Sequence, residues 1–384
     1  MEQVKGMQEV DQRENNSGNN KGNSKGNNKD AQNQANIDTL ARRSVLNSEP
    51  YITAPRVPGA IYLDANENPY GRRYSLTLEA NRYPEPQPTT LINRYAKFLQ
   101  VDPSEILVTL GGDTGIDLLI KAFCEPGQDR LLYCPPTFGM YQVTCDLYGV
   151  ETVAVPLQDD FSLDLPAILT ALSDQKIKML FLCSPNNPTA NKMNAPEMIQ
   201  ILEATRDRAI VVVDEAYIEL SEAESFTQQL KDYPHLAIIR TLSKAFGLAG
   251  IRCGFVVANQ PLIALLRRVM SPYPIPVPVI AMAEMALSDE GIAQMQQDRA
   301  TILANKKVLI EALSACNEVI RIYSSDTNFL LVQLRDVTKA INALIDQRIF
   351  VRQQSSSRLN QCVRISVGLP EENEALVAVL AGLS

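Results

Sequence analysis

The chain has 384 residues, a formal net charge of −8 at pH 7, and ordinary apolar and charged fractions of 45% and 21%. This length allows two domains or one large α/β unit. The acidic balance argues against nucleic acid as a main partner, and no apolar run reaches the roughly 18 residues that a membrane span needs. The acidic N-terminus resembles neither a signal nor a transit peptide.

Cysteine and histidine usage limits the kinds of site that the chain can build. There are seven cysteines, irregularly spaced and without a C-x-x-C motif, which indicates buried free thiols in a reducing cytoplasm. The single histidine, His235, argues against a zinc site of His and Cys and against a Ser-His-Asp triad. We therefore interpret His235 as structural and expect no metal.

The N-terminal region changes character near residue 36. Residues 11–36 contain no apolar residue larger than alanine, so we expect residues 1–36 to form a disordered polar tail. Residues 37–75 include "PGAIYLDANENPYG", a short apolar run that ends in turn formers. We expect this segment to pack with the smaller, C-terminal domain.

Residues 76–275 alternate short apolar runs with helical patterns. The runs "EILVTL", "DRLLYC", "ETVAVPL", "IKMLFLC", "AIVVVD", "LAIIRT" and "RCGFVVAN" predict strands of a mostly parallel sheet covered by helices on both faces. Ligands of such sheets bind outside the carboxyl ends of the strands. Polar residues cluster there, which predicts a site built from Gly111–Asp113, Tyr141, Asn186, Asn187, Asp214, Tyr217, Ser243 and Lys244.

A proline-rich stretch, "SPYPIPVPVI", separates this region from the rest, because proline disfavours helix interiors and central strands. Residues 281–313 then read as helix. They precede strands in "NFLLVQL", "IFVRQ" and "CVRISVG" and two further helices, near 337–347 and 371–383. We expect residues 276–384 to form a smaller α+β domain.

Asp214 and Lys244 each follow a buried strand, and each has an ordinary explanation. Asp214 could cap a helix opened by "DEAY", and a lone lysine is more often structural. Together they fit pyridoxal phosphate: a desolvated lysine attacks its aldehyde, and a carboxylate keeps its ring nitrogen protonated.

The phosphate of such a cofactor needs donors. "GGD" before a helix offers backbone N–H groups at Gly112 and Asp113, and Ser243 and Arg252 flank the lysine. Tyr141 could stack on the cofactor ring. Asn187 and Tyr217 could bond its phenolic oxygen, although core tyrosines and turn asparagines need no such role.

The motifs "SPNNPT", "VVVDEAY" and "TLSKAFGLAGIRCG" resemble the fold-type I pyridoxal-phosphate aminotransferases. "LDANENPYG", "NRYPEPQP", "AFCEPGQDRLLYCPPTFGMY" and "CVRISVG" narrow the resemblance to the histidinol-phosphate aminotransferases, from about residue 61 to the end of the chain. The resemblance implies a homodimer that exchanges an amino group between glutamate and imidazole acetol phosphate in histidine biosynthesis.

The resemblance also implies roles for individual residues. Lys244, Asp214 and Tyr217 would be catalytic. Tyr83 would reach the cofactor phosphate of the neighbouring subunit. Arg364 would receive the substrate carboxylate, and Arg352 the substrate phosphate, with Asn187 also at the substrate.

Two positions depart from the family pattern. Ala190 stands where the family has glycine after "NPT", so a positive φ there would strain the backbone, and Thr114 replaces an acid after "GGD". Two enzyme alternatives share the fold: an aromatic aminotransferase and a phospho-amino-acid decarboxylase. A regulatory module without catalysis is the third reading, disfavoured because Lys244 and Asp214 are both present.

Overall fold

The computed structural model describes residues 57–70, 78 and 80–383. The predicted polar tail, residues 1–36, lies outside this range, as does most of the segment 37–75. In the described part, no helix combines the length and the apolar character needed to cross a membrane.

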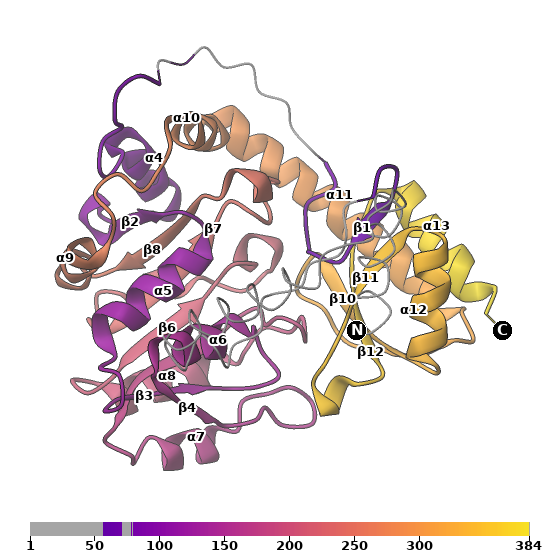
Figure 1. The fold of residues 1–384 in the computed structure, drawn as a ribbon, viewed down its shortest axis with the longest axis horizontal. Coiled ribbons are helices and arrows are strands. Elements are labelled where there is room, and N and C mark those ends of the chain that lie inside the picture. The colour runs from indigo at the N-terminus through magenta and orange to yellow at the C-terminus, as the bar shows by residue number, and fades with distance from the viewer. Residues whose placement is uncertain (1–56, 71–77, 79, 384) are drawn as a thin grey trace, which may run out of the picture. The chain divides into compact units, whose positions relative to one another are not determined.

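The larger of two sheets has seven strands in the order β2-β8-β7-β6-β5-β3-β4 (Figure 1). Six strands run parallel, and β8 runs antiparallel to both of its neighbours, β2 and β7. This arrangement confirms the mostly parallel sheet predicted from the apolar runs. The strands are β2 (Ile106–Thr109), β3 (Arg130–Tyr133), β4 (Glu151–Ala154), β5 (Ile177–Cys183), β6 (Ile210–Asp214), β7 (Leu236–Thr241) and β8 (Gly254–Ala258).

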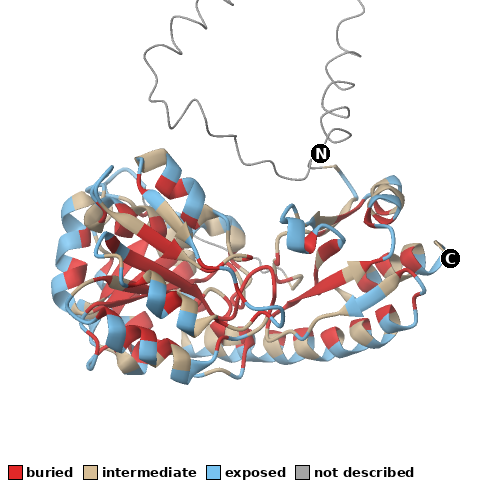
Figure 2. Ribbon diagram, turned by 90° about the horizontal axis from the view of Figure 1, so that it is seen from below, coloured by how far each residue is buried: buried red, intermediate tan, exposed pale blue. Residues whose placement is uncertain are grey.

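Both faces of this sheet are buried, which explains why its strands are apolar without alternation. On β6, Val211 and Val213 join one core cluster and Val212 joins another, because successive side chains point to opposite faces. Figure 2 shows most of the strand residues as buried, whereas the edge strand β4 has none that is buried. The covering helices are α4 (Thr89–Leu99), α7 (Leu165–Ala171), α8 (Ala195–Thr205) and α10 (Val277–Ala286) on the first face, and α5 (Gly112–Phe123), α6 (Met140–Tyr148) and α9 (Gln260–Val269) on the second.

The smaller sheet has five strands in the order β1-β11-β12-β10-β9. Its first strand, β1, comes from the N-terminal segment and pairs in parallel with β11, and the other pairs are antiparallel. The strands are β1 (Ile61–Leu63), β9 (Val319–Ile322), β10 (Phe329–Leu334), β11 (Ile349–Gln353) and β12 (Cys362–Ser366). Helices α12 (Val337–Asp346) and α13 (Pro370–Ala381) pack on this sheet.

The expected helix over residues 281–313 is divided into α10 and a long helix, α11 (Asp289–Ser314). Ser288 is the N-cap of α11, because its side chain accepts a hydrogen bond from the backbone N–H of Gly291 (3.1 Å). A side chain on Gly291 would collide with the carbonyl oxygen of Ala286. Helix α11 then joins the two sheets: Met295 packs in the core of the larger sheet and Leu309 in that of the smaller.

Among the described residues, short 3₁₀ helices connect several elements: η1 (Pro103–Glu105), η2 (Ile218–Leu220), η3 (Phe226–Gln229), η4 (Ala249–Ile251) and η5 (Ser357–Leu359). The residues after Asp214 form η2 rather than the α-helix that "DEAY" could have opened.

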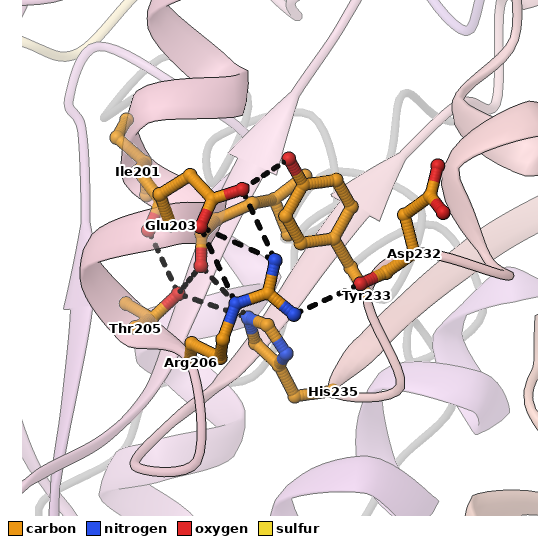
Figure 3. Close-up of polar contacts among 8 residues, drawn as sticks. Ile201, Glu203, Thr205, Arg206, Asp232, Tyr233 and His235 are labelled. Carbon is orange, nitrogen blue, oxygen red and sulfur yellow. Dashed lines mark hydrogen bonds and ion pairs between the residues drawn. The ribbon is translucent and has the colours of Figure 1, made fainter.

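His235 lies outside the region where the polar strand ends meet. Its Nε2 lies 3.0 Å from the carbonyl oxygen of Leu202 and 3.3 Å from Oγ1 of Thr205 (Figure 3). Burial lowers the pKa of this imidazole. Beside it, Tyr233 and Arg206 both bond Glu203, so the cluster ties α8 to the start of β7. Among the described residues, no group of three or more His, Cys, Asp or Glu side chains is arranged to hold a metal ion.

Candidate active site

A cavity of about 260 Å³ lies at the carboxyl ends of the large-sheet strands and extends to the smaller sheet. It brings together most of the site residues predicted from the sequence. Those that line it are Gly112, Asp113, Asn187, Asp214, Tyr217, Ser243, Lys244, Arg252, Arg352 and Arg364.

Asp214 is the last residue of β6, and it lines the cavity. Oδ2 accepts a hydrogen bond from the hydroxyl of Tyr141 (2.7 Å), and Oδ1 accepts one from the backbone N–H of Ala216 (3.1 Å). Burial raises the pKa of Asp214 to about 6, although both hydrogen bonds act to lower it. The carboxylate is therefore ready for a cationic partner inside the cavity.

Tyr141 has a different place from the one that the sequence suggested. It is fully buried, its ring stacks on Phe181 at 4.5 Å, and it is not among the residues that line the cavity. Phe138 supplies the aromatic face there, from the "PPTFGMY" loop after β3. Phe138 was not predicted from the sequence. It lies three positions before Tyr141, and residue spacing does not say which of these two aromatic side chains faces the cavity.

Lys244 follows β7 of the larger sheet and contacts the segment that follows β1 of the smaller sheet. Its Nζ donates to the carbonyl oxygen of Ala65 (2.8 Å) and lies 5.6 Å from the centre of the Tyr217 ring. Burial, together with the charge of Arg364, lowers the pKa of this amine to about 8. An amine with this pKa is partly neutral near pH 7–8, as a nucleophile must be.

The other end of the cavity is suited to a phosphate. Helix α5 begins at Gly112 and directs its N-terminal N–H groups there, beside Ser243 and Arg252. Arg252 is held by Asp113 (3.0 Å). A Cβ on Gly254 would lie 2.5 Å from the backbone carbon of Gly111, so glycine alone lets β8 approach this turn.

These residues fit pyridoxal phosphate. The cavity offers a helix N-terminus, a hydroxyl and a guanidinium at one end, a carboxylate on its floor and a partly neutral lysine. Asp214 is buried and Lys244 is half-buried beside the same cavity, and a ligand that pairs with both would offset the cost of placing these charges there.

Arg364, on β12, faces the cavity from the smaller sheet. Its Nη1 donates to Oδ1 of Asn187 (2.7 Å), and its Nη2 donates to the carbonyl oxygen of Asp64. Arg352, on β11, is its direct neighbour across the two strands and also lines the cavity. Two cations side by side favour an anionic ligand between or above them.

The structure also places residues 64–66 on the cavity wall, which the sequence analysis had not singled out as site residues. The carbonyl oxygens of Asp64 and Ala65 accept from Arg364 and Lys244, and Nδ2 of Asn66 donates to the hydroxyl of Tyr217 (3.1 Å). The "LDANENPYG" motif was visible, but its pairing with β11 is a long-range contact that residue patterns do not reveal.

Ala190 has φ +68, so the departure from glycine does place an alanine in the left-handed region. Its backbone N–H donates to the carbonyl oxygen of Asn186 (2.9 Å), and its carbonyl oxygen accepts from the N–H of Asp326 (2.8 Å). These bonds hold the strained conformation. Thr114, the other departure, donates its hydroxyl to the carbonyl oxygen of Leu110 (3.0 Å) in the first turn of α5.

Tyr83 does not line the cavity of its own chain. It is 81% exposed and stacks on Tyr273 at 4.6 Å between ring centres. Its predicted contact with a neighbouring subunit stays a prediction.

Comparisons with known proteins agree with this geometry. Residues 62–380 match the family model "Aminotransferase class I and II". "Histidinol-phosphate aminotransferase 2" of Mannheimia succiniciproducens is 48% identical over 349 residues, which cover 90% of this chain and 99% of that protein. "Histidinol-phosphate aminotransferase" of Yersinia pestis is 46% identical over 352 residues, covering 91% and 92%.

A solved structure is also similar. The histidinol-phosphate aminotransferase from Sinorhizobium meliloti, in complex with pyridoxal-5'-phosphate, matches with a TM-score of 0.78 and 25% identity, over 84% of this chain and 90% of that one. The chain therefore belongs to the class I and II aminotransferases and, among them, to the family of histidinol-phosphate aminotransferases.

Proposed function

We propose that this chain exchanges an amino group between histidinol phosphate and 2-oxoglutarate, giving imidazole acetol phosphate and glutamate, in histidine biosynthesis. The observation that carries the proposal is the convergence of Lys244, Asp214 and the Arg352–Arg364 pair on one cavity. Relatives of this name at 46–48% identity over nearly the whole chain support the same substrates.

The cofactor is pyridoxal phosphate, which supplies an aldehyde that condenses with amines and a protonated ring that withdraws electrons. Gly112, Asp113, Ser243 and Arg252 would hold its phosphate. Asp214 would hold the ring nitrogen, with Phe138 against the ring and Asn187 and Tyr217 at its phenolic oxygen. Tyr141 supports this set by holding Asp214 from behind.

Lys244 has two tasks in this scheme. Its neutral Nζ would be the amine that holds the cofactor aldehyde, and the same atom, once free, would move a proton from the substrate Cα to the cofactor carbon. Burial beside Arg364 suits both tasks because it lowers the pKa of Lys244 to about 8. Asp64 and Ala65 enclose the amine from the smaller sheet and exclude water.

The substrates bind in turn at the same cations. Glutamate presents carboxylates, whereas histidinol phosphate presents a phosphate ester and no α-carboxylate. The planar fork of arginine binds either group in a bidentate manner. We assign Arg364 to both substrates and Arg352 to the phosphate.

The working unit is a homodimer, in which the exposed Tyr83 contributes to the phosphate site of its neighbour. The enzyme works in the cytoplasm, in agreement with seven cysteines that are all buried free thiols. Residues 76–275 form the cofactor-binding domain and residues 276–384 the smaller domain. The N-terminal segment is attached to the latter through β1.

Borohydride reduction of the loaded protein followed by peptide mass mapping tests the cofactor assignment. Lys244 should carry the cofactor mass. Lys306 is an internal control, because burial also lowers its pKa to about 8 while its Nζ is held by the carbonyl oxygens of Ser325 and Thr327, both at 2.8 Å. Label on Lys306, or none on Lys244, contradicts the assignment.

Substrate identity is tested by single-turnover rates with histidinol phosphate, aromatic amino acids and a phosphorylated amino acid. Histidinol phosphate should react fastest, and 2-oxoglutarate should complete the cycle. A faster aromatic donor would make the chain an aromatic aminotransferase, and release of carbon dioxide would make it a decarboxylase.

A further inference from the structure

Asn66 connects two residues that are far apart in the sequence. Its backbone N–H donates to Oγ of Ser366 (2.7 Å), which in turn donates to Oδ1 of Asn66 (3.1 Å). Its Nδ2 donates to the hydroxyl oxygen of Tyr217 (3.1 Å). All three residues are buried, at 1%, 2% and 4% exposure, so water does not compete for these bonds.

The first of these bonds has a direction that cannot be reversed. A backbone N–H only donates, so Oγ of Ser366 must accept from Asn66. The single proton of Ser366 remains to be donated, and in the structure it is given to Oδ1 of Asn66, so that the NH₂ group of the amide faces Tyr217. The hydroxyl oxygen of Tyr217 is therefore an acceptor on this side.

A phenol has one proton and donates it once. Because Asn66 already donates to the oxygen of Tyr217, the proton of Tyr217 is directed elsewhere, and Tyr217 lines the cavity. The reversed amide would draw that proton away from the cavity. Burial raises the pKa of Tyr217 to about 12, against lowering effects of Arg364 and of the Asn66 bond, so the hydroxyl keeps its proton at neutral pH.

The surroundings keep Asn66 in place. Its φ is +54, in the left-handed region that asparagine and glycine tolerate best. Its carbonyl oxygen accepts from Nδ2 of Asn328 (3.1 Å). Ser366 ends β12, the strand that carries Arg364 two positions earlier. The amide is thus fixed by the smaller sheet while it acts on a residue of the larger one.

We propose that Asn66 and Ser366 are positioning residues that direct the hydroxyl proton of Tyr217 into the cavity. The inference rests on the proposed function, in which Tyr217 donates to the phenolic oxygen of pyridoxal phosphate. A directed proton stabilises negative charge on that oxygen, whereas a proton free to rotate does so only part of the time.

The test is the pH midpoint of the visible absorbance change of bound pyridoxal phosphate. Asn66→Gly removes the amide and still permits the positive φ, and we expect its midpoint to rise by about 0.5–1 pH unit, the scale of one hydrogen bond. The midpoint of Tyr217→Phe should rise further. The midpoint of Ser366→Ala should rise less, because this variant removes only the hydrogen bond that holds the Asn66 amide in its orientation. Arg364, Asp214 and Lys244 surround Tyr217 and are unchanged in all three variants.

Asn68→Ala is the matched control. Asn68 is a buried asparagine in the same segment, but its Nδ2 donates to the carbonyl oxygen of Ala245 (3.0 Å) rather than to Tyr217. The pH midpoint of Asn68→Ala should equal that of the wild type. Wild-type midpoints in both Asn66→Gly and Ser366→Ala, together with a raised midpoint in Tyr217→Phe, would overturn the inference and leave the proposed function intact.

Neutron diffraction of the cofactor-free protein gives an answer that does not depend on the cofactor. We expect two deuterons on the Asn66 atom that faces Tyr217, and the Tyr217 deuteron pointing away from Asn66. A Tyr217 deuteron pointing at Asn66 would overturn the inference. Failure of the wild type to bind pyridoxal phosphate would count against the proposed function alone.

Discussion

Arg352 and Arg364 face each other directly across the antiparallel pair β11–β12, and both line the cavity that holds Lys244. Like charges at such a cross-strand position destabilise a sheet, and we propose that an anionic substrate offsets this cost when it binds.

We expect Arg364→Ala to slow the half-reactions of both glutamate and histidinol phosphate. The activation free energy of each should rise by about 2–5 kcal/mol, the scale for truncating one partner of a buried charge pair. Arg352→Ala should slow mainly the half-reaction of histidinol phosphate. Single-turnover rates measure each one separately. Arg321→Ala, on β9 of the same sheet but outside the cavity lining, is the control. Loss of the glutamate half-reaction alone in Arg364→Ala would refute the shared site.

Asp214→Asn should make the cofactor-free protein more stable while it removes activity. The fold raises the pKa of Asp214 from 3.8 to about 6, so the folded protein binds this proton more tightly than the unfolded chain does. The stability that protonated Asp214 contributes to the folded state is fully present below pH 4 and is lost as the pH rises through 6. Asparagine cannot ionise, so the variant should gain up to about 2–3 kcal/mol above pH 6.

Urea unfolding of the cofactor-free protein between pH 5 and 8 measures this gain. A difference that does not change with pH would contradict it. The rate of the loaded variant should fall by ~10³-fold, by analogy with other catalytic centres in which one group is mischarged. A rate within about tenfold of the wild type would mean that Asp214 has only a local structural role.

Tyr141→Phe removes a hydrogen bond that lowers the pKa of Asp214, so that pKa should rise, by about one unit. Binding of pyridoxal phosphate, which needs the carboxylate, should then fall off at a correspondingly higher pH. Equilibrium dialysis across pH 5–8 measures the midpoint. Tyr148→Phe is a close control, because Tyr148 bonds Asp117 at 2.8 Å from the same helix, α6, but outside the cavity lining. Equal midpoints in the two variants would exclude a role for Tyr141.

Ala190→Gly should stabilise the protein by about 1 kcal/mol, because glycine adopts a φ of +68 without the steric cost that alanine bears. Urea or thermal unfolding measures the change. Ala304→Gly, at an exposed position inside α11, should instead destabilise by about 1 kcal/mol, as glycine does in helix interiors. A loss of stability in both variants would show that strain at Ala190 is negligible.

Shared active sites predict complementation between subunits. Tyr83→Phe and Lys244→Ala proteins should each be impaired, and a heterodimer of the two regains one complete site. Random exchange of equal amounts should restore about a quarter of the wild-type activity. No recovery, once mass spectrometry has shown that subunits exchange, would argue against a contribution of Tyr83 to the neighbouring site.

The residue patterns were most informative where a side chain's role is fixed by its own strand. The apolar runs predicted the large sheet, and the rule that ligands bind at the carboxyl ends of strands correctly predicted that Asp214, Lys244 and Asn187 lie together. The patterns were less informative at the "PPTFGMY" loop, where burial decided that Phe138 faces the cavity and Tyr141 faces Asp214. They also merged α10 and α11, because one serine cap and one close glycine contact determine that break.

By itself, the sequence determined the fold class and the family and predicted the roles of the central residues, because strand periodicity and the order of short motifs are local properties. Only the tertiary structure decided which carbonyl accepts from Lys244, which amide donates to Tyr217 and which arginines stand side by side. The first two contacts join residues 179 and 151 positions apart. Their geometry depends on how two sheets and the segment Asp64–Asn66 meet, and no local pattern encodes that packing.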